Sequence, residues 1–245
     1  MTEFCKNCNT PVDNKFCPAC GQKTSVSRFT MKHLFHDFVH GFFHVDHGLF
    51  YTAKKLAQNP GKMLRDYLRG HRIKYFNPFT FILLVGGLSA FLLPKVHWHS
   101  YFIDIGIIVK KSVDQDLWNS SLKHFSIRLL LGIPLYALVT KIFYYRKNYN
   151  FSEHLIANTF IRAELSFGML VIAPFELFWN SVDSFVIIKT ALMIGMMLYV
   201  AWAYAGLFDE RITLISLAKG FIVIFIAIVA EMTILNLVIL KELPF

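Results

Sequence analysis

Five long apolar segments constrain the fold of this chain most strongly, because each approaches the roughly 20 residues that a membrane-spanning helix needs. They occupy residues 77–94, 127–145, 155–178, 184–207 and 215–240. Of the 245 residues, 55% are hydrophobic and 16% are aromatic, which exceeds the usual composition of soluble domains. The sequence therefore predicts an all-α polytopic membrane protein with about five transmembrane helices, formed by residues 76–245.

Basic residues are concentrated ahead of the first apolar segment. Twelve of the 25 Lys and Arg residues precede Tyr75. An excess of Lys and Arg marks the cytoplasmic side of a membrane protein. We therefore expect a cytoplasmic N-terminus and, with five spans, a C-terminus on the opposite side. The connection between Lys95 and Lys123 also carries lysines and is the weakest part of this assignment.

All four cysteines lie in the first twenty residues, in the pairs Cys5-x-x-Cys8 and Cys17-x-x-Cys20. This spacing is typical of metal ligands, and four thiolates favour Zn, with iron as an alternative. Two disulfides or a redox dithiol would also use such pairs, but disulfides need an oxidising compartment. Residues 1–24 are thus expected to form a small zinc-ribbon-like head. A closed four-thiolate site is structural, and its metal supplies the folding energy.

Residues 29–75 are expected to form a juxtamembrane segment that begins with an amphipathic helix. From residue 29 to about residue 58, apolar residues recur at helical spacing on one side. Five histidines lie on the other side: His33, His36, His40, His44 and His47. Two interpretations stay open, a metal-binding or pH-sensing face and a solvated polar face.

A basic segment follows the turn Asn59-Pro60-Gly61. Its cations are Lys62, Arg65, Arg69, Arg72 and Lys74, and they alternate with apolar and aromatic residues. Beside a membrane, each such cation attracts anionic headgroups by roughly 1 kcal/mol. We expect this segment to bind anionic membrane lipid or a cytoplasmic protein partner. Nucleic acid is not expected, because the segment adjoins a membrane span.

Polar residues inside the apolar segments are candidates for function because burying them in lipid is costly. They are Arg162, Glu164 and Glu231. The alternative is that each is hydrogen-bonded at an interface between helices. At the mouth of the third span lie Glu153 and His154, and the pattern Asn150-x-x-Glu153 predicts a capping box. No catalytic motif is evident, so no catalytic residue is assigned and a non-enzymatic role is favoured over an enzyme.

Several motifs resemble those of the DUF3667 family, bacterial polytopic membrane proteins found mainly in Bacteroidetes and without an assigned activity. The matching motifs are Cys20-Gly21-Gln22, Pro60-Gly61, Tyr67-Leu68-x-Gly70-x-Arg72-x-x-Tyr75-x-Asn77-Pro78-Phe79 and Glu153-His154-Leu155. The resemblance implies a membrane location and a zinc-ribbon head. With the orientation expected from the basic residues and five spans, the chain would lie in the bacterial inner membrane with its C-terminus in the periplasm. It adds no reaction, and the histidine face is not a feature associated with the family.

Three functional hypotheses follow. The first is an inner-membrane scaffold, anchor or regulatory module whose cytoplasmic zinc ribbon and basic segment dock a protein or anionic lipid. The second is a transporter or channel for a small solute, ion or lipid that uses Glu231, Glu164 and Arg162. The third is a membrane enzyme that acts on lipid at the cytoplasmic face with Glu153, His154 and the basic residues around Arg72. Convergence of the three intramembrane charges on one cavity would favour the second.

Overall fold

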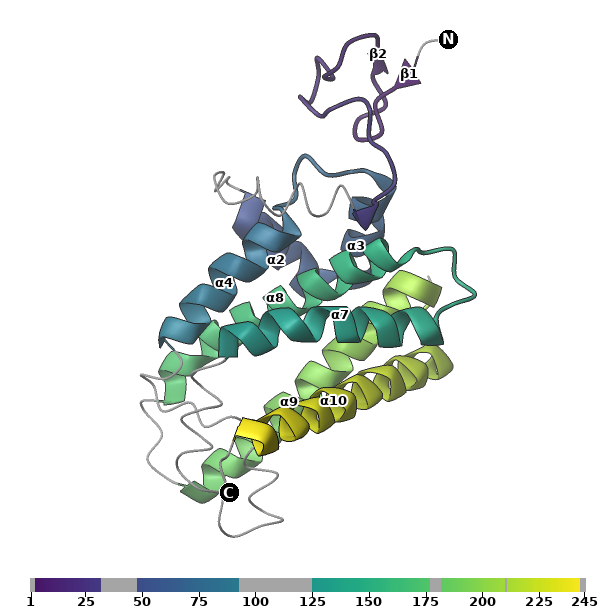
Figure 1. The fold of residues 1–245 in the computed structure, drawn as a ribbon. Helices are drawn as coiled ribbons and strands as arrows, with labels where there is room; N and C mark the ends of the chain where they lie inside the picture. The colour runs from purple at the N-terminus through teal and green to yellow at the C-terminus, as the bar shows by residue number, and fades with distance from the viewer. Residues whose placement is uncertain (1–2, 32–47, 93–124, 177–181, 210, 243–245) are drawn as a thin grey trace.

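The computed structural model describes residues 3–31, 48–92, 125–176, 182–209 and 211–242 (Figure 1). Its elements, in chain order, are β1 Glu3–Phe4, β2 Pro11–Val12, α2 Gly48–Gln58, α3 Pro60–Arg69, α4 Pro78–Leu92, α7 Phe125–Phe143, α8 Phe151–Glu176, α9 Val182–Tyr204, the π-helical turn η3 Ala205–Asp209 and α10 Leu214–Glu242. The two short strands pair antiparallel and belong to the head. The rest of the head has an isolated antiparallel bridge between Phe16 and Lys23, and from Gly48 onward the described residues are helical or connect helices.

A helix occupies each of the five predicted apolar segments, so the predicted fold class is confirmed. Three stretches are long and apolar enough to cross a membrane, namely Phe151–Ile172, Ala191–Asp209 and Leu214–Ile234. Two shorter apolar stretches, Pro78–Ser89 and Gly132–Phe143, lie in α4 and α7. The chain is thus a helical membrane protein with three clear candidate spans and two shorter apolar helices among the described residues.

The ends of the helices follow local capping signals. Asn59 accepts a hydrogen bond from the Lys62 backbone N–H at 3.2 Å, and Pro60 begins α3, as is usual for the first helical position. The predicted turn at Asn59 is therefore a corner between α2 and α3. Asn77 caps α4 in the same way, ahead of Pro78. The two Asn-Pro pairs therefore begin α3 and α4, and the basic segment lies between these two helix starts.

The third long helix begins earlier than the apolar pattern predicted. The Asn150 side chain accepts a hydrogen bond from the Glu153 N–H at 2.9 Å, and Glu153 accepts one from the Asn150 N–H at 2.8 Å. This reciprocal pair is a capping box, as expected, and it starts α8 at Phe151 rather than at residue 155. The polar first turn carries no hydropathy signal, so the apolar window alone placed the start too late.

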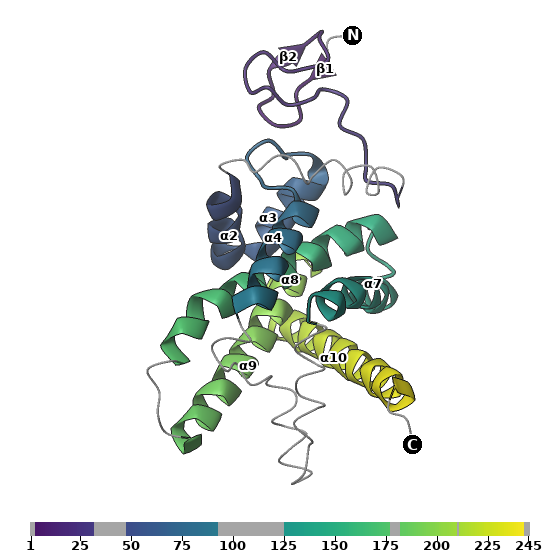
Figure 2. The ribbon, with the colours of Figure 1, turned by 60° about the vertical axis from the view of Figure 1, so that its left-hand side comes forward.

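Helix α8 lies at the centre of the body, where it packs against α4 and α7, while α10 packs against α9 and α7. Helices α2 and α3 cover one end, and the head projects from that end above them (Figures 1 and 2). The α3 helix approaches η3 so closely that a Cβ at Gly61 would lie 2.4 Å from the Gly206 carbonyl carbon. A side chain at Gly61 would therefore push α3 off the body.

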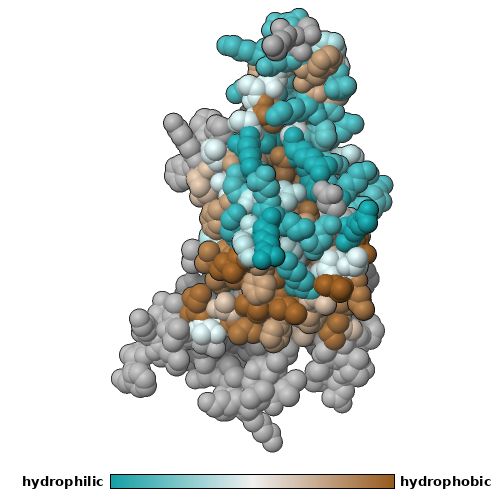
Figure 3. Space-filling model, turned by 90° about the vertical axis from the view of Figure 1, so that its right-hand side faces the viewer, coloured by the Kyte–Doolittle hydropathy of each residue, from teal (hydrophilic) through white to brown (hydrophobic). Residues whose placement is uncertain are grey.

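The end of the body that carries the head is polar. The Lys147 ammonium lies 3.0 Å from the Asp209 carboxylate, which joins the connection after α7 to the end of α9. Figure 3 shows hydrophilic side chains over the head and the upper body, with a band of hydrophobic side chains beneath them. On α10, Ile222 and Phe225 are more than half exposed. Such an apolar surface matches a lipid-facing helix rather than a soluble domain.

The predicted juxtamembrane helix is helical over Gly48–Gln58, but Phe29 and Thr30, where it was expected to begin, are not helical. Its buried residues, Thr52, Ala53 and Leu56, face the body. The Thr52 hydroxyl accepts a hydrogen bond from the Phe76 N–H at 2.8 Å and so ties α2 to the entry of α4. The five predicted histidines, His33, His36, His40, His44 and His47, lie outside the described residues.

Candidate metal centre and its attachment to the helical body

The two cysteine pairs form equivalent turns. In the first, the Cys5 N–H donates to the Thr10 carbonyl and the Asn9 N–H donates to the Cys5 carbonyl, at 2.9 and 2.8 Å. In the second, the Cys17 and Gly21 N–H groups make the corresponding bonds at 2.8 and 2.9 Å. Each turn needs a residue with positive φ after its second cysteine. These are Asn9 at 58° and Gly21 at 74°, residue types that tolerate this conformation.

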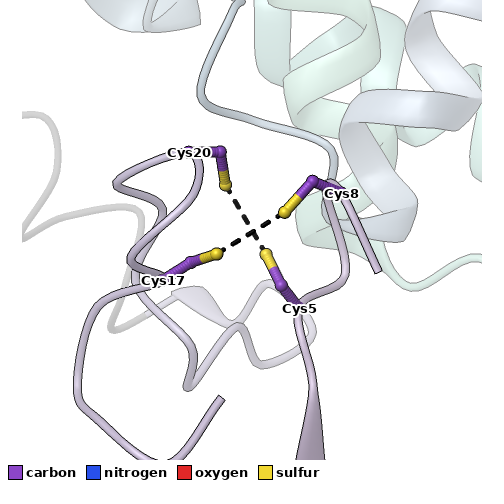
Figure 4. Close-up of side chains that lie close together, drawn as sticks. All are labelled: Cys5, Cys8, Cys17 and Cys20. Atoms are coloured by element: carbon purple, nitrogen blue, oxygen red, sulfur yellow. Dashed lines mark hydrogen bonds between the residues drawn. The ribbon is translucent and has the colours of Figure 1, made fainter. Parts of the chain in front are cut away.

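The four thiols converge on one point between the turns (Figure 4). The Cys5 and Cys20 sulfurs are 3.6 Å apart, the Cys8 and Cys17 sulfurs are 3.5 Å apart, and all four lie within 4.8 Å of one another. Four sulfurs at about 2.3 Å from a tetrahedral zinc would be separated by about 3.8 Å. The arrangement therefore fits a tetrahedral metal ion, and all four cysteines are free thiols rather than disulfides.

The thiols differ in how readily they ionise. Hydrogen bonds from the Thr10 side chain and backbone lower the pKa of Cys8 to about 6. The backbone of Gln22 favours the Cys20 thiolate, but burial and the neighbouring thiols outweigh it and raise the pKa of Cys20 to about 11. Four adjacent thiolates repel one another unless a cation neutralises them. A metal ion at their centre would thus complete the head.

Gln22, directly after the second turn, attaches the head to the body. Its side-chain amide donates to the Gly70 carbonyl at 2.8 Å, and its oxygen accepts from the Arg72 and Ile73 N–H groups at 3.1 and 3.3 Å. The side chain is buried, so these bonds form away from water. We call Gln22, Gly70, Arg72 and Ile73 the head latch. It ties the metal-binding turn to the loop that ends α3.

Gly70 has the conformation that this loop requires. Its φ of 112° caps α3, and a Cβ there would lie 3.2 Å from side-chain atoms of both Lys6 and Val26. Glycine is therefore needed both for the backbone conformation and for close approach of the head.

Among the five predicted lipid-binding cations, Arg72 has a role within the fold. Its guanidinium lies 3.6 Å from the Phe29 ring centroid and donates to the Ser27 carbonyl at 3.1 Å. Lys62, Arg69 and Lys74 are exposed, and Arg65 is half-buried. Exposed cations at the polar end keep the prediction of lipid or partner binding open for that part of the segment.

Glu153 is engaged by a residue far away in the chain. The Arg28 guanidinium donates to both Glu153 carboxylate oxygens, at 2.6 and 2.7 Å, and also to the Asn148 carbonyl. The Asn150 side-chain amide donates to the Phe29 carbonyl at 2.9 Å. The segment after the head is thus fixed to the start of α8.

His154 points away from Glu153 into the helix bundle. Its Nδ1 lies 3.0 Å from the Thr140 hydroxyl, and its ring stacks on Phe208 of η3 at 4.9 Å between centroids. Asn158 donates to the same hydroxyl at 3.1 Å and accepts from the Tyr204 hydroxyl at 2.7 Å. His154 therefore belongs to a buried polar network between α7, α8 and α9, and the two predicted mouth residues do not share a site.

Two of the three predicted intramembrane charges form a pair. The Arg162 guanidinium donates to the Glu231 carboxylate at 3.0 Å, and the Tyr136 hydroxyl donates to the same carboxylate at 2.8 Å. Gly132 makes room for the pair, because a Cβ there would lie 2.5 Å from an Arg162 nitrogen. The pair joins α7, α8 and α10. Glu164 is not part of it and has a buried carboxylate oxygen without a hydrogen-bond partner in the described structure.

Comparison with known protein families identifies a match to part of this chain. Residues 46–89 match the DUF3667 family, a protein family of unknown function. The resemblance seen in the motifs is confirmed over these residues. No curated protein and no solved structure matches the chain. The DUF3667 segment covers α2, α3, most of α4 and, with Gly70, Arg72 and Ile73, the body side of the head latch.

Sequence reasoning missed Gln22, Arg28 and Tyr136 as functional positions. Gln22 had one signal, since it ends the DUF3667-like motif Cys20-Gly21-Gln22. Arg28 had none, because its partner Glu153 is 125 residues away. For Tyr136, the only local sign is the nearby Gly132 in an apolar helix.

Proposed function

We propose that this chain is a membrane-anchored docking protein of the bacterial inner membrane. The helical body is the anchor, and the cytoplasmic head, folded around a structural zinc ion, recruits a protein partner or anionic lipid together with the basic segment. The membrane-associated helical body and the four-cysteine cluster are the observed foundations of this proposal.

The observation that carries the proposal is a fixed head with exposed aromatic residues. Phe4 and Phe16 are 57% and 60% exposed. A head of this size has few apolar side chains, yet these two do not contribute to its core. Exposed aromatic side chains are typical of interfaces with partners. Because the head latch fixes the head to the body, such a surface is preorganised and loses little entropy when a partner binds.

The charge distribution supports a cytoplasmic head. The basic segment lies at the same end of the body as Arg146 and Lys147, which follow α7. Arg211, between η3 and α10, is at this end too. Cations gathered at one end of a helical membrane protein favour the cytoplasmic side.

Recovery of partners from native membranes tests the proposal. The full-length protein would be purified with its bound proteins and lipids, alongside a Phe4→Ser/Phe16→Ser variant. Phe50→Ser is the matched control, because Phe50 is 75% exposed but lies on α2. We expect one protein, or anionic lipid, to be recovered with the wild type and the control and to be depleted from the head variant. Equal recovery from all three would contradict the proposal.

Glu164 supports a second candidate function, the transport of a small ion or solute. A buried carboxylate oxygen without a partner among the described residues is a candidate ion or proton site. The transport hypothesis predicts proton or cation flux into liposomes that contain the purified protein, and loss of this flux in Glu164→Gln. Flux that is absent, or unchanged in this variant, would remove the second candidate.

A further inference from the structure

A cavity of about 230 Å³ lies between the head and the helical body. Its charged lining comes from four parts of the chain: Lys6 from the first cysteine turn, Arg28 from the segment after the head, Arg69 and Arg72 from the end of α3 and beyond, and Glu153 from α8. The cavity therefore exists only when the head is docked, since Lys6 lies between Cys5 and Cys8.

The lining has an excess of positive charge. Four cationic side chains face one carboxylate, so the formal charge of the lining is +3. Glu153 is already engaged, since it accepts hydrogen bonds from two guanidinium nitrogens of Arg28 and from the Asn150 N–H. A carboxylate with these bonds is a fixed part of the wall. An anion that enters the cavity would meet the positive potential of these four cations.

Neutral groups hold two of these cations in position. The Lys6 ammonium donates to the Val26 carbonyl at 2.6 Å. Arg72 donates to the Ser27 carbonyl at 3.1 Å and stacks over Phe29. Carbonyls and an aromatic ring orient the cations without cancelling their charge. Such preorganised guanidinium and ammonium groups match the several oxygens of a phosphate group.

We propose that this cavity binds a phosphate group, presented either by a phospholipid headgroup or by a soluble phosphate. This inference rests on the proposed function, because it assigns a ligand class to the docked head. Phosphate bound between Lys6 and Arg69 would stabilise the docked position of the head. By linkage, docking and phosphate binding would strengthen each other.

Phosphate binding can be measured on the full-length, zinc-loaded protein in a maltoside detergent, which contains no phosphate. One arm titrates inorganic phosphate and the other adds phosphatidic acid in mixed micelles. We expect saturable binding in at least one arm, and the arm with the higher affinity identifies the source. An absence of saturable binding in both arms would overturn the inference.

Variants locate the site. Losing one charge-assisted hydrogen bond weakens binding roughly tenfold or more, so we expect Lys6→Gln and Arg69→Gln each to raise the Kd at least tenfold. Lys6→Arg should retain binding. Lys62→Gln is the matched control, because Lys62 is exposed on α3 but does not line the cavity. Equal weakening by Lys62→Gln would also overturn the inference.

Zinc content and thermal unfolding of each variant show whether the head is folded. If the wild-type protein keeps zinc and recruits its partner but does not bind phosphate, then only this inference fails. Loss of partner recovery with intact phosphate binding would instead contradict the proposed function and leave the phosphate site standing.

Discussion

Replacing Gln22 with Ala should detach the head from the body without removing the metal. The Gln22 side chain makes three hydrogen bonds to the loop after α3, of 2.8, 3.1 and 3.3 Å. At a net value of about 1 kcal/mol for each bond, their loss would cost about 3 kcal/mol. This free energy corresponds to a change of about 100-fold in the equilibrium between the docked and detached head.

Hydrogen exchange measures this change at the atoms concerned, because the Arg72 and Ile73 N–H groups are the donors to Gln22. We expect Gln22→Ala to speed exchange of these two amides by up to about 100-fold in the full-length protein, with zinc still bound. Gln58→Ala is the matched control, since Gln58 is exposed at the end of α2. Unchanged exchange at Arg72 and Ile73 would refute the head latch.

Further predictions concern the helix bundle and the thiols. Gly132→Ala places a Cβ 2.5 Å from an Arg162 nitrogen and should lower stability by about 1–3 kcal/mol. Thermal unfolding in detergent would show this. Gly168→Ala should have little effect, because within the described residues nothing beyond the local helix backbone lies within 4 Å of a Cβ at Gly168. Zinc should protect Cys8 and Cys20 from alkylation, because both thiols would be metal ligands. Mass spectrometry should find them alkylated only after zinc is removed, and equally fast alkylation of the zinc-loaded protein would contradict this. Removing zinc should leave the far-ultraviolet circular dichroism of the helices nearly unchanged.

Features that depend on neighbouring residues could be predicted from the sequence. The metal-binding turns follow from the Cys-x-x-Cys spacing, and the start of α3 follows from Asn59-Pro60. The Asn150–Glu153 capping box was also predicted, because its two partners lie three residues apart. The five apolar helices follow from hydropathy alone. Each of these needs only local information.

Contacts across the fold could not be predicted. Arg72 was expected to face lipid, since a basic side chain near a membrane usually does, and nothing local indicates that Phe29 lies beneath it. The head latch joins residues 48 positions apart. No single-sequence pattern reports which loop a buried glutamine will reach.

The pairing of the intramembrane charges could not be predicted from the sequence either. Arg162 and Glu164 are two residues apart on α8, so their side chains point about 200° apart around the helix. Arg162 thus meets Glu231 on α10, while Glu164 faces elsewhere. Hydropathy identified all three charged residues as costly to bury in lipid. Only the packing of α7, α8 and α10 decides which of them pair.

Hydrogen exchange of the full-length protein in lipid nanodiscs, with zinc and after its removal by a chelator, tests the central claim most directly. If the metal-folded head is fixed to the membrane body, removing zinc should speed exchange at Arg72 and Ile73 as well as in the head, and the core of α8 should stay protected. Faster exchange in the head alone, with Arg72 and Ile73 unchanged, would contradict the claim and show that the head is not coupled to the body.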